Sequence, residues 1–264
     1  MDFLRAAAHK LGVDLDENQQ AQFERYRELI ELRSKQFNLT GLKTWEKIRN
    51  ELFIRSLRVL SPAGGNVPTP EWFTDKRAID IGTGAGIPGI VLKIALPELH
   101  ITLVDSNQKK TNFLTEVVNA LELSNTKVIN GRAEELAQQN DHREQYDVVF
   151  ARAVARLNEL AELTIPFANI GGTVILPKSH GSEEEVEEAA AAAEILGAAP
   201  AITIPVNKPG NSPPDDMVYW MKISSTPDKF PRSNGIPHQS PINLDKIKAL
   251  DHAPASLEQN YIKY

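Results

Sequence analysis

The stretch Asp80-Ile81-Gly82-Thr83-Gly84-Ala85-Gly86-Ile87-Pro88-Gly89 decides the fold of this chain. It follows a short apolar, β-branched run at 78–81 and leads into a helix-like segment at 87–96. Glycines at such a junction let the backbone approach a ligand over the carboxyl end of the strand, where any Cβ would hold the ligand away.

Further strand-like runs alternate with helix-like segments downstream. The strand-like runs lie at 101–104, 127–129, 147–150 and 173–176, and the helix-like segments lie at 108–122, 132–139 and 156–168. This alternation predicts βαβ units and a parallel, doubly wound sheet. Two later runs, 201–204 and 217–223, are joined by the Pro-rich segment 205–214, and we expect them to form an antiparallel pair that closes the sheet.

Residues 1–60 are typical of a helical subdomain. Asp16 and Gln19 form a capping box in which Gln takes the place of Glu, and Thr44 caps a second helix. We expect the first helix to end near Gly41 in a left-handed cap. The predicted domains are a helical subdomain at 1–60, a linker at 61–75, a sheet domain at 76–224 and an extended C-terminal tail at 225–264.

The composition excludes several chemistries. None of the 264 residues is cysteine, which rules out disulfides, iron–sulfur clusters, thiolate zinc sites and cysteine nucleophiles. The six histidines never fall at metal-ligand spacing, so we expect no metal. No apolar run reaches the roughly 18 residues of a membrane span, and the first residues lack the pattern of a secretory signal. We therefore expect a cytoplasmic protein, and a monomer because no coiled-coil heptads occur.

The net charge of −6 argues against a strongly basic nucleic-acid-binding protein. However, residues 183–194 contain six glutamates and no basic residue, so the rest of the chain is neutral overall. A local basic face is compatible with this distribution.

An acidic residue, Asp105, follows the second predicted strand about 23 residues after Gly82. A carboxylate at that place can accept hydrogen bonds from both ribose hydroxyls, so the pair of motifs predicts a nucleoside-bearing cofactor. We expect Asp105 at a solvated rim; the alternative is that it caps the helix beginning near Gln108. Gly84, Gly86 and Gly89 match the dinucleotide pattern of NAD-binding proteins, but Pro88 has no N–H for a pyrophosphate.

The other frame, Asp-x-Gly-x-Gly-x-Gly, resembles motif I of class I S-adenosylmethionine methyltransferases, and we favour this cofactor over NAD or a turn that binds nothing.

Elimination reduces the number of possible methyl acceptors. Without cysteine, C5 methylation of pyrimidines is excluded. The signature of exocyclic-amine methyltransferases is missing from Phe150-Ala151-Arg152-Ala153, where it belongs. A ring nitrogen such as guanine N7 needs no deprotonation and is compatible with the absence of an obvious base.

Several stretches together resemble one family, the bacterial small-subunit ribosomal RNA methyltransferase G family, also called glucose-inhibited division protein B. They are 37–40, 80–89, 103–106 with Lys109-Lys110, 131–135, 151–156, 176–178, 229–232, 235–237 and 240–242. The resemblance implies a Rossmann-like α/β class I methyltransferase, with a mostly parallel seven-stranded sheet, an antiparallel closing strand and an N-terminal helical subdomain. It also implies S-adenosylmethionine-dependent N7 methylation of one guanosine in 16S rRNA, with the small ribosomal subunit or its precursor as partner.

The resemblance also assigns site residues. By motif it places Gly82, Ile87, Ala133, Glu134 and Arg152 at the cofactor, and the glycine loop and the end of the second strand add Gly84, Gly86, Asp105 and Ser106 as cofactor-binding candidates. Acceptor-site candidates are Arg152 and Lys178, and RNA-binding candidates are Asn38, Lys178 and Arg232. One departure lies at Glu51–Leu57, where many family members carry a basic residue, a His and an Asp that this chain replaces with Glu51, Leu52 and Arg55. The alternatives are a methyltransferase with a protein or small-molecule acceptor and a non-catalytic ribosome-binding factor.

Overall fold

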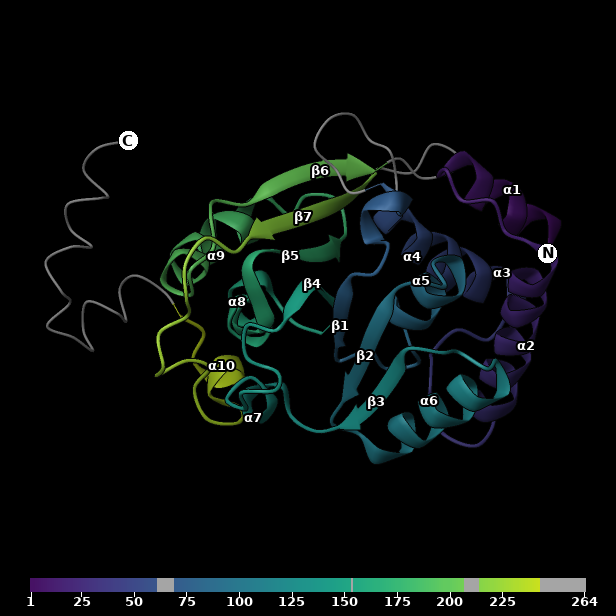
Figure 1. Cartoon of the computed structure of the whole chain (residues 1–264), viewed down its shortest axis with the longest axis horizontal. Coiled ribbons are helices and arrows are strands. Elements are labelled where there is room, and N and C mark those ends of the chain that lie inside the picture. The colour runs from purple at the N-terminus through teal and green to yellow at the C-terminus, as the bar shows by residue number, and fades with distance from the viewer. Residues whose placement is uncertain (61–68, 153, 207–213, 243–264) are drawn as a thin grey trace, which may run out of the picture.

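The computed structural model describes residues 1–60, 69–152, 154–206 and 214–242 (Figure 1). Within them, seven strands form one sheet in the order β3-β2-β1-β4-β5-β7-β6. The strands are β1 (Arg77–Ile81), β2 (His100–Asp105), β3 (Thr126–Asn130), β4 (Tyr146–Ala151), β5 (Ala168–Lys178), β6 (Ile202–Val206) and β7 (Asp215–Met221). Pairs among β1 to β5 are parallel, whereas β7 runs antiparallel to both β5 and β6. The predicted sheet and its antiparallel closing pair are confirmed.

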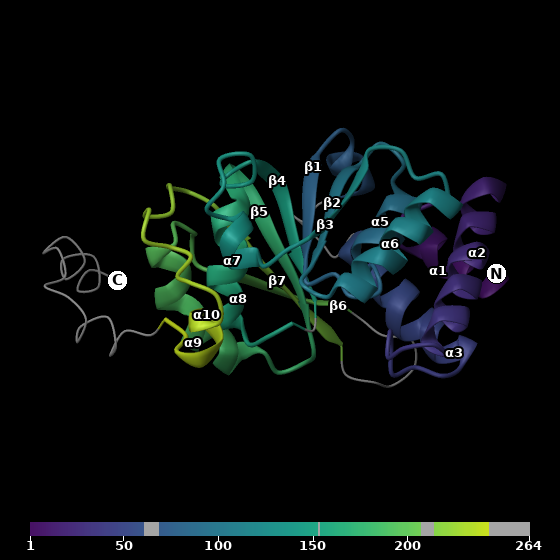
Figure 2. The ribbon, with the colours of Figure 1, turned by 90° about the horizontal axis from the view of Figure 1, so that it is seen from below.

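Helices cover both faces of the sheet (Figure 2). On one face lie α5 (Gly89–Ala95) and α6 (Gln108–Ala120), and on the other lie α7 (Ala133–Leu136), α8 (Leu157–Thr164) and α9 (Glu183–Ile195). Successive strand residues point to opposite faces, so Leu103 enters one buried cluster and Val104 the other. Because both faces of the sheet are buried, the central strands are continuous apolar runs in the sequence. Helix α7 is shorter than the predicted segment 132–139.

The N-terminal helices add a third layer outside α5 and α6 (Figure 2). They are α1 (Asp2–Lys10), α2 (Glu17–Ser34), α3 (Trp45–Lys47), the π-helix η1 (Ile48–Ile54), α4 (Arg55–Leu57) and the 3₁₀-helix η2 (Arg58–Leu60). Phe23 and Phe53 belong to the same buried cluster as Leu103 of the sheet. These helices and the sheet therefore share one core.

The helix ends test the capping predictions. The capping box is confirmed, since Asp16 Oδ1 accepts from the Gln19 N–H at 2.7 Å and Gln19 Oε1 accepts from the Asp16 N–H at 2.9 Å. The Thr44 cap is also confirmed. The left-handed cap at Gly41 is wrong: α2 ends at Ser34, and Gly41 does not have a positive φ. The N–H groups of Gln36 and Phe37 turn back to the Arg33 carbonyl, so the helix end needs no left-handed residue.

The remaining connections differ from simple linkers. Residues 61–68 of the predicted linker lie outside the described residues, and the 3₁₀-helix η3 (Pro70–Phe73) buries Phe73. The C-terminal segment 225–242 is not extended throughout, because it contains α10 (Ile236–Gln239). Residues 243–264 of the predicted tail lie outside the described part. No helix in the described ranges is both long and apolar enough to cross a membrane.

A buried ion pair fastens this C-terminal segment to the sheet domain. The Arg232 guanidinium donates to both carboxylate oxygens of Glu162, which is fully buried in α8, and to the Ser240 carbonyl. Bidentate geometry of this kind compensates the loss of hydration of a buried carboxylate.

Arg232→Ala is expected to lower the free energy of unfolding by about 3–5 kcal/mol, because it leaves the Glu162 carboxylate buried and unpaired. The double variant Arg232→Ala/Glu162→Ala should lose less, since the uncompensated charge is gone. Urea denaturation measures both. Arg25→Ala, which breaks an exposed pair with Glu28, is the control and should change stability by less than about 1 kcal/mol. Equal losses in the single and double variants would contradict this account.

Candidate functional site

The glycine-rich loop is held at the carboxyl end of β1 by Asp80. One carboxylate oxygen of Asp80 accepts the Gly89 N–H at 2.8 Å and the Thr83 hydroxyl, so it ties the two ends of the loop together. Burial raises the pKa of Asp80 to about 7, although the hydrogen bonds from Thr83 and Gly89 and the charge of Arg152 act in the opposite direction. The other oxygen, Oδ1, is buried and makes no hydrogen bond to the described residues.

The N-terminal layer braces the same loop through Tyr26 of α2. The Tyr26 hydroxyl donates to the Ala85 carbonyl, and the side chain is fully buried. A Cβ on Gly86 would lie 2.8 Å from this hydroxyl and 2.5 Å from Ile90 Cγ1, and Gly86 has a φ of +93°. Glycine at position 86 is therefore required by packing within the protein, not only by the approach of a ligand.

Asp105 ends β2 beside the loop. Its Oδ2 accepts the Gly84 N–H at 2.9 Å and lies 3.7 Å from Lys110 Nζ, while its Oδ1 accepts the Asn107 N–H. Asp105 is only 6% exposed, so the expectation of a solvated rim is wrong: the loop and α6 close over the carboxylate. The cap of α6 is Asn107, whose side chain accepts from Lys109 and Lys110. Carboxylate oxygens accept more than one hydrogen bond, so Asp105 retains capacity for a ligand.

Five of the predicted cofactor residues line one cavity of about 150 Å³: Gly82, Asp105, Ser106, Ala133 and Glu134. Glu134 is the second residue of α7 and is buried; its Oε1 accepts the Gly235 N–H at 2.9 Å. His238 of α10 also lines the cavity, so the C-terminal segment forms part of its wall. The structure thus brings together residues that the sequence spreads over more than 150 positions.

The other predicted cofactor residues lie elsewhere. Gly84 contacts Asp105, Gly86 packs against Tyr26, and the Ile87 side chain belongs to the buried core cluster. Val154 covers Gly82, because a Cβ on Gly82 would lie 2.7 Å from Val154 Cγ2. Both residues line the cavity, so Val154 forms the wall beside Gly82.

Arg152 follows β4 and reaches the N-terminal layer. Its guanidinium donates to Ser56 Oγ at 3.2 Å and to the Glu51 carbonyl. Burial, and then the neighbouring charge of Arg55, lowers the pKa of Arg152 to about 10, so the side chain stays charged at neutral pH. The stretch Glu51–Leu57, which departs from the family pattern, is therefore the segment that contacts Arg152.

Two of the three replaced positions, Glu51 and Arg55, belong to an ionic network beside Arg152. Asp215 of β7 is buried and pairs with Arg55 at 2.7 Å and with Arg58 at 2.9 Å, while Arg55 also lies 3.5 Å from Glu51. This network joins the N-terminal helices to the closing strand. Sequence reasoning did not assign Asp215 a role, since its partners lie some 160 positions away.

The predicted RNA-binding residues do not form one group. Lys178 ends β5 and pairs with Glu185 at 2.7 Å. The guanidinium of Arg232 is engaged by Glu162, which gives it a structural role in this conformation. Asn38 is exposed and has no hydrogen bond to the described residues. Contacts of these residues with RNA remain predictions.

The residues present fit the predicted cofactor, S-adenosylmethionine. The orphaned Asp80 Oδ1 is a buried acceptor that lacks a donor, and the ammonium of an amino acid is such a donor. The carboxylates of Asp105 and Glu134 are suited to accept hydrogen bonds from the hydroxyls and the exocyclic amino group of a nucleoside. Asp80 and Tyr26 were not predicted as site residues. Asp80 is the first residue of the glycine-rich motif, and this position could have identified it as a site residue. Nothing in the sequence distinguishes Tyr26 from its neighbours on the apolar helix face.

A family model and individual relatives agree on the family to which this chain is similar. The sequence model of one family, described as rRNA small subunit methyltransferase G, matches residues 19–209. A protein of Roseiflexus castenholzii named ribosomal RNA small subunit methyltransferase G is 40% identical over 242 residues, covering 92% of this chain and all of that protein. A protein of the same name from Lachnoclostridium phytofermentans is 39% identical over 88% of this chain and 93% of its own length.

Among solved structures, a predicted O-methyltransferase from Agrobacterium tumefaciens superposes with a TM-score of 0.50 at 18% identity. The match covers 65% of this chain and 82% of that one. This likeness concerns the fold alone.

Tyr26→Phe is expected to lower the free energy of unfolding by about 1–3 kcal/mol, because the buried Ala85 carbonyl loses its donor. Tyr219→Phe is the matched control, since Tyr219 is also buried but its hydroxyl makes no hydrogen bond to the described residues. Thermal or urea denaturation compares the two. If both variants lost the same small amount of unfolding free energy, the hydrogen bond between Tyr26 and the loop would not contribute to stability.

The raised pKa of Asp80 predicts a pH-dependent stability. A carboxyl that ionises at about 7 when folded but near 4 when unfolded favours the native state at low pH, and this contribution is lost as the pH rises towards 7. Relative to Asp80→Asn, the wild-type protein should lose about 1.4 kcal/mol per pH unit between pH 5 and 7 and no more above that. Parallel stability curves for the two proteins would show that Asp80 ionises normally.

Proposed function

Because this chain belongs to the family of rRNA small subunit methyltransferase G, we propose that it methylates N7 of one guanosine in 16S rRNA, using S-adenosylmethionine. The observation that carries the proposal is the match to the family along most of the chain. The cavity at the carboxyl ends of β1, β2 and β3 supports it, because this is where open α/β sheets bind their ligands.

We propose that the residues lining this cavity hold the cofactor. Asp105 accepts hydrogen bonds from the ribose hydroxyls, Ala133 and Glu134 face the adenine, and the backbone at Gly82 lies beside the amino-acid part. Ser106 and the loop glycines Gly84 and Gly86 complete the site, the last two by shaping the loop. Asp80 Oδ1 receives the ammonium group. This contact also keeps the Asp80 carboxyl ionised, because a positive neighbour lowers the pKa of an acid.

When bound, S-adenosylmethionine supplies a methyl group on a sulfonium, which the lone pair of guanine N7 can attack without losing a proton. The protein's task is therefore positioning, not proton transfer. Arg152 lies at the end of β4, held by the Glu51 carbonyl and the Ser56 hydroxyl, and we assign it to the acceptor side of the site. Lys178 at the end of β5 is the second cation on that side, and its contact is a phosphate or the guanine edge.

The partner in this proposal is the small ribosomal subunit or its precursor, and the protein acts as a monomer in the cytoplasm. Asn38 provides a further RNA contact from the N-terminal layer. Arg232 contributes to RNA binding only if its guanidinium leaves Glu162.

The proposal is tested by transfer of tritiated methyl groups to 16S rRNA or small subunits from a strain lacking the enzyme, followed by identification of the modified nucleoside. We expect N7-methylguanosine. In parallel, S-adenosylmethionine or its demethylated product should raise the melting temperature, whereas NAD should not. Label in protein but not in RNA, or stabilisation by NAD alone, would overturn the proposal.

Asp105→Ala is expected to weaken cofactor binding by at least ~10-fold. Two charge-assisted hydrogen bonds to ribose, each typically about 1.5–3 kcal/mol, are lost, and 1.4 kcal/mol corresponds to one decade. Asp105→Asn should lose less, because its amide oxygen still accepts. Calorimetric titration measures the affinity for the cofactor. Thermal denaturation separately measures any loss of stability caused by the lost contact with the Gly84 N–H. A destabilised Ala variant with normal affinity would show that Asp105 only supports the loop.

Arg152→Ala and Lys178→Ala should lower the rate of methyl transfer more than the affinity for the cofactor, because both side chains are assigned to the acceptor. Arg156→Ala is the matched control, since Arg156 lies in the same loop but is exposed and paired with Glu188. Single-turnover rates at saturating cofactor measure the effect. Unchanged turnover in both variants would place the acceptor elsewhere.

A further inference from the structure

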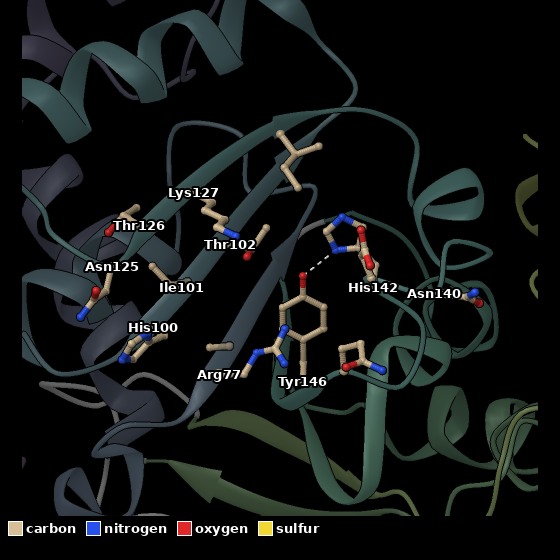
Figure 3. Close-up of a pocket in the computed structure, with 14 residues that line it drawn as sticks. Arg77, His100, Ile101, Thr102, Asn125, Thr126, Lys127, Asn140, His142 and Tyr146 are labelled. Atoms are coloured by element: carbon tan, nitrogen blue, oxygen red, sulfur yellow. Dashed lines mark hydrogen bonds between the residues drawn. The ribbon is translucent and has the colours of Figure 1, made fainter.

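A second and larger cavity lies at the opposite end of the same strands. It has a volume of about 740 Å³ and is lined by the first residues of β1, β2, β3 and β4 together with the turn at 140–145 (Figure 3). His100 in this cavity and Asp105 in the cofactor cavity are the two ends of β2, which places the cavities roughly 16 Å apart along the strand. None of the residues proposed to hold the cofactor lines this second cavity.

The hollow exists because no helix covers this part of the sheet. Helix α7 has only four residues and packs through Leu136 near the carboxyl ends of the strands. On the same face the amino ends of β2 and β3 are open at His100 and Lys127, which are exposed, whereas Thr102 between them is buried. Their side chains there include Thr102 and Lys127, polar groups where a covered parallel sheet would carry apolar ones. The sequence of these strands therefore suits an open, polar sheet surface.

The lining combines cations with aromatic rings. Arg77 and Lys127 are exposed, and neither forms an ion pair with any described carboxylate. The Arg77 guanidinium lies 5.6 Å from the centre of the Tyr146 ring. His142 lies parallel to Tyr146 and is joined to its hydroxyl at 2.7 Å (Figure 3). Burial lowers the pKa of His142 below its usual value; the charge of Asp141 opposes this, and the charges of Lys127 and Arg77 lower the pKa further.

We propose that this cavity binds a single-stranded segment of the RNA substrate, away from the nucleotide that is methylated. Arg77 and Lys127 contact phosphates, and the partly exposed imidazole of His142, which is joined to the hydroxyl of the buried Tyr146, is the ring against which a base can stack. Sheet surfaces that carry aromatic rings and cations bind single-stranded nucleic acids in this way. Asp141 is the one acid among the lining residues. The inference rests on the proposed function, since it requires an RNA substrate.

The test compares two double variants with the wild-type protein. Arg77→Gln/Lys127→Gln removes the two cations of the cavity. Arg5→Gln/Lys10→Gln removes two exposed cations from α1, which lies in the third layer on the other side of the sheet, and is the matched control. The Kd for an unmethylated 16S rRNA transcript is measured from 50 to 300 mM salt. At 150 mM salt the cavity variant should bind about tenfold more weakly, and the slope of log K against log salt should fall by about 1.4.

Photocrosslinking gives a second, positional measurement. A transcript carrying 4-thiouridine should form adducts with the peptide that contains His142 and Tyr146. Adducts confined to other peptides would contradict the proposal, and so would equal affinity losses in the cavity and control variants. If nucleoside monophosphates bind the wild-type cavity but the cavity variant keeps normal RNA affinity, the occupant is a free nucleotide and the proposal is wrong.

The experiments distinguish failure of this inference from failure of the proposed function. The cavity variant should retain the thermal stabilisation by S-adenosylmethionine, because the cofactor residues are unchanged. If the wild-type protein methylates the transcript but the cavity variant binds it normally, only this inference fails. If the wild-type protein transfers no methyl group to RNA, the proposed function fails as well.

Discussion

At the end of β1, one oxygen of the buried Asp80 carboxylate accepts hydrogen bonds from Thr83 and from the Gly89 N–H, and the geometry of the site follows from these two contacts. They close the glycine-rich loop on itself and start α5 at its far end. The closed loop then offers the Gly84 N–H to Asp105, so that neighbouring strands present their acidic residues at one edge. Donors at one oxygen offset part of the cost of burying this carboxyl group, whereas its second oxygen has no hydrogen-bond partner among the described residues.

The N-terminal helices act on the site through the same loop. Tyr26 packs between Gly86 and the ring of Phe53, so the third layer reaches the backbone of the loop directly. A second connection runs from Glu51 and Ser56 to Arg152 on the far side of the loop. The helices that the sequence suggests as a separate subdomain are thus part of the wall that supports the site, because their apolar faces and those of α5 and α6 bury each other.

Charge is distributed unevenly over this acidic protein. Six of its glutamates lie on α9, whereas Arg77 and Lys127 line the cavity at the amino ends of the strands and Arg152 follows the end of β4. Arg55 and Arg58 both pair with the buried Asp215, and Arg55 also lies beside Glu51, but Arg152 donates only to uncharged groups. Local arrangement, not net charge, therefore sets the sites at which an anionic substrate can be bound.

The sequence by itself determined the order of strands and helices, the glycine loop, the acid at the end of β2 and the family, because these depend on short-range patterns of polarity and spacing. It also indicated the Asp16 capping box, which involves residues three apart. It failed where distant segments meet. The burial of Asp105, the brace from Tyr26, the Arg232–Glu162 pair and the Arg55–Asp215 pair depend on which side chains the fold brings together. Tertiary packing likewise decides the short length of α7 and the cavity beside it. A polar strand residue such as Lys127 does not show in the sequence whether a helix covers it.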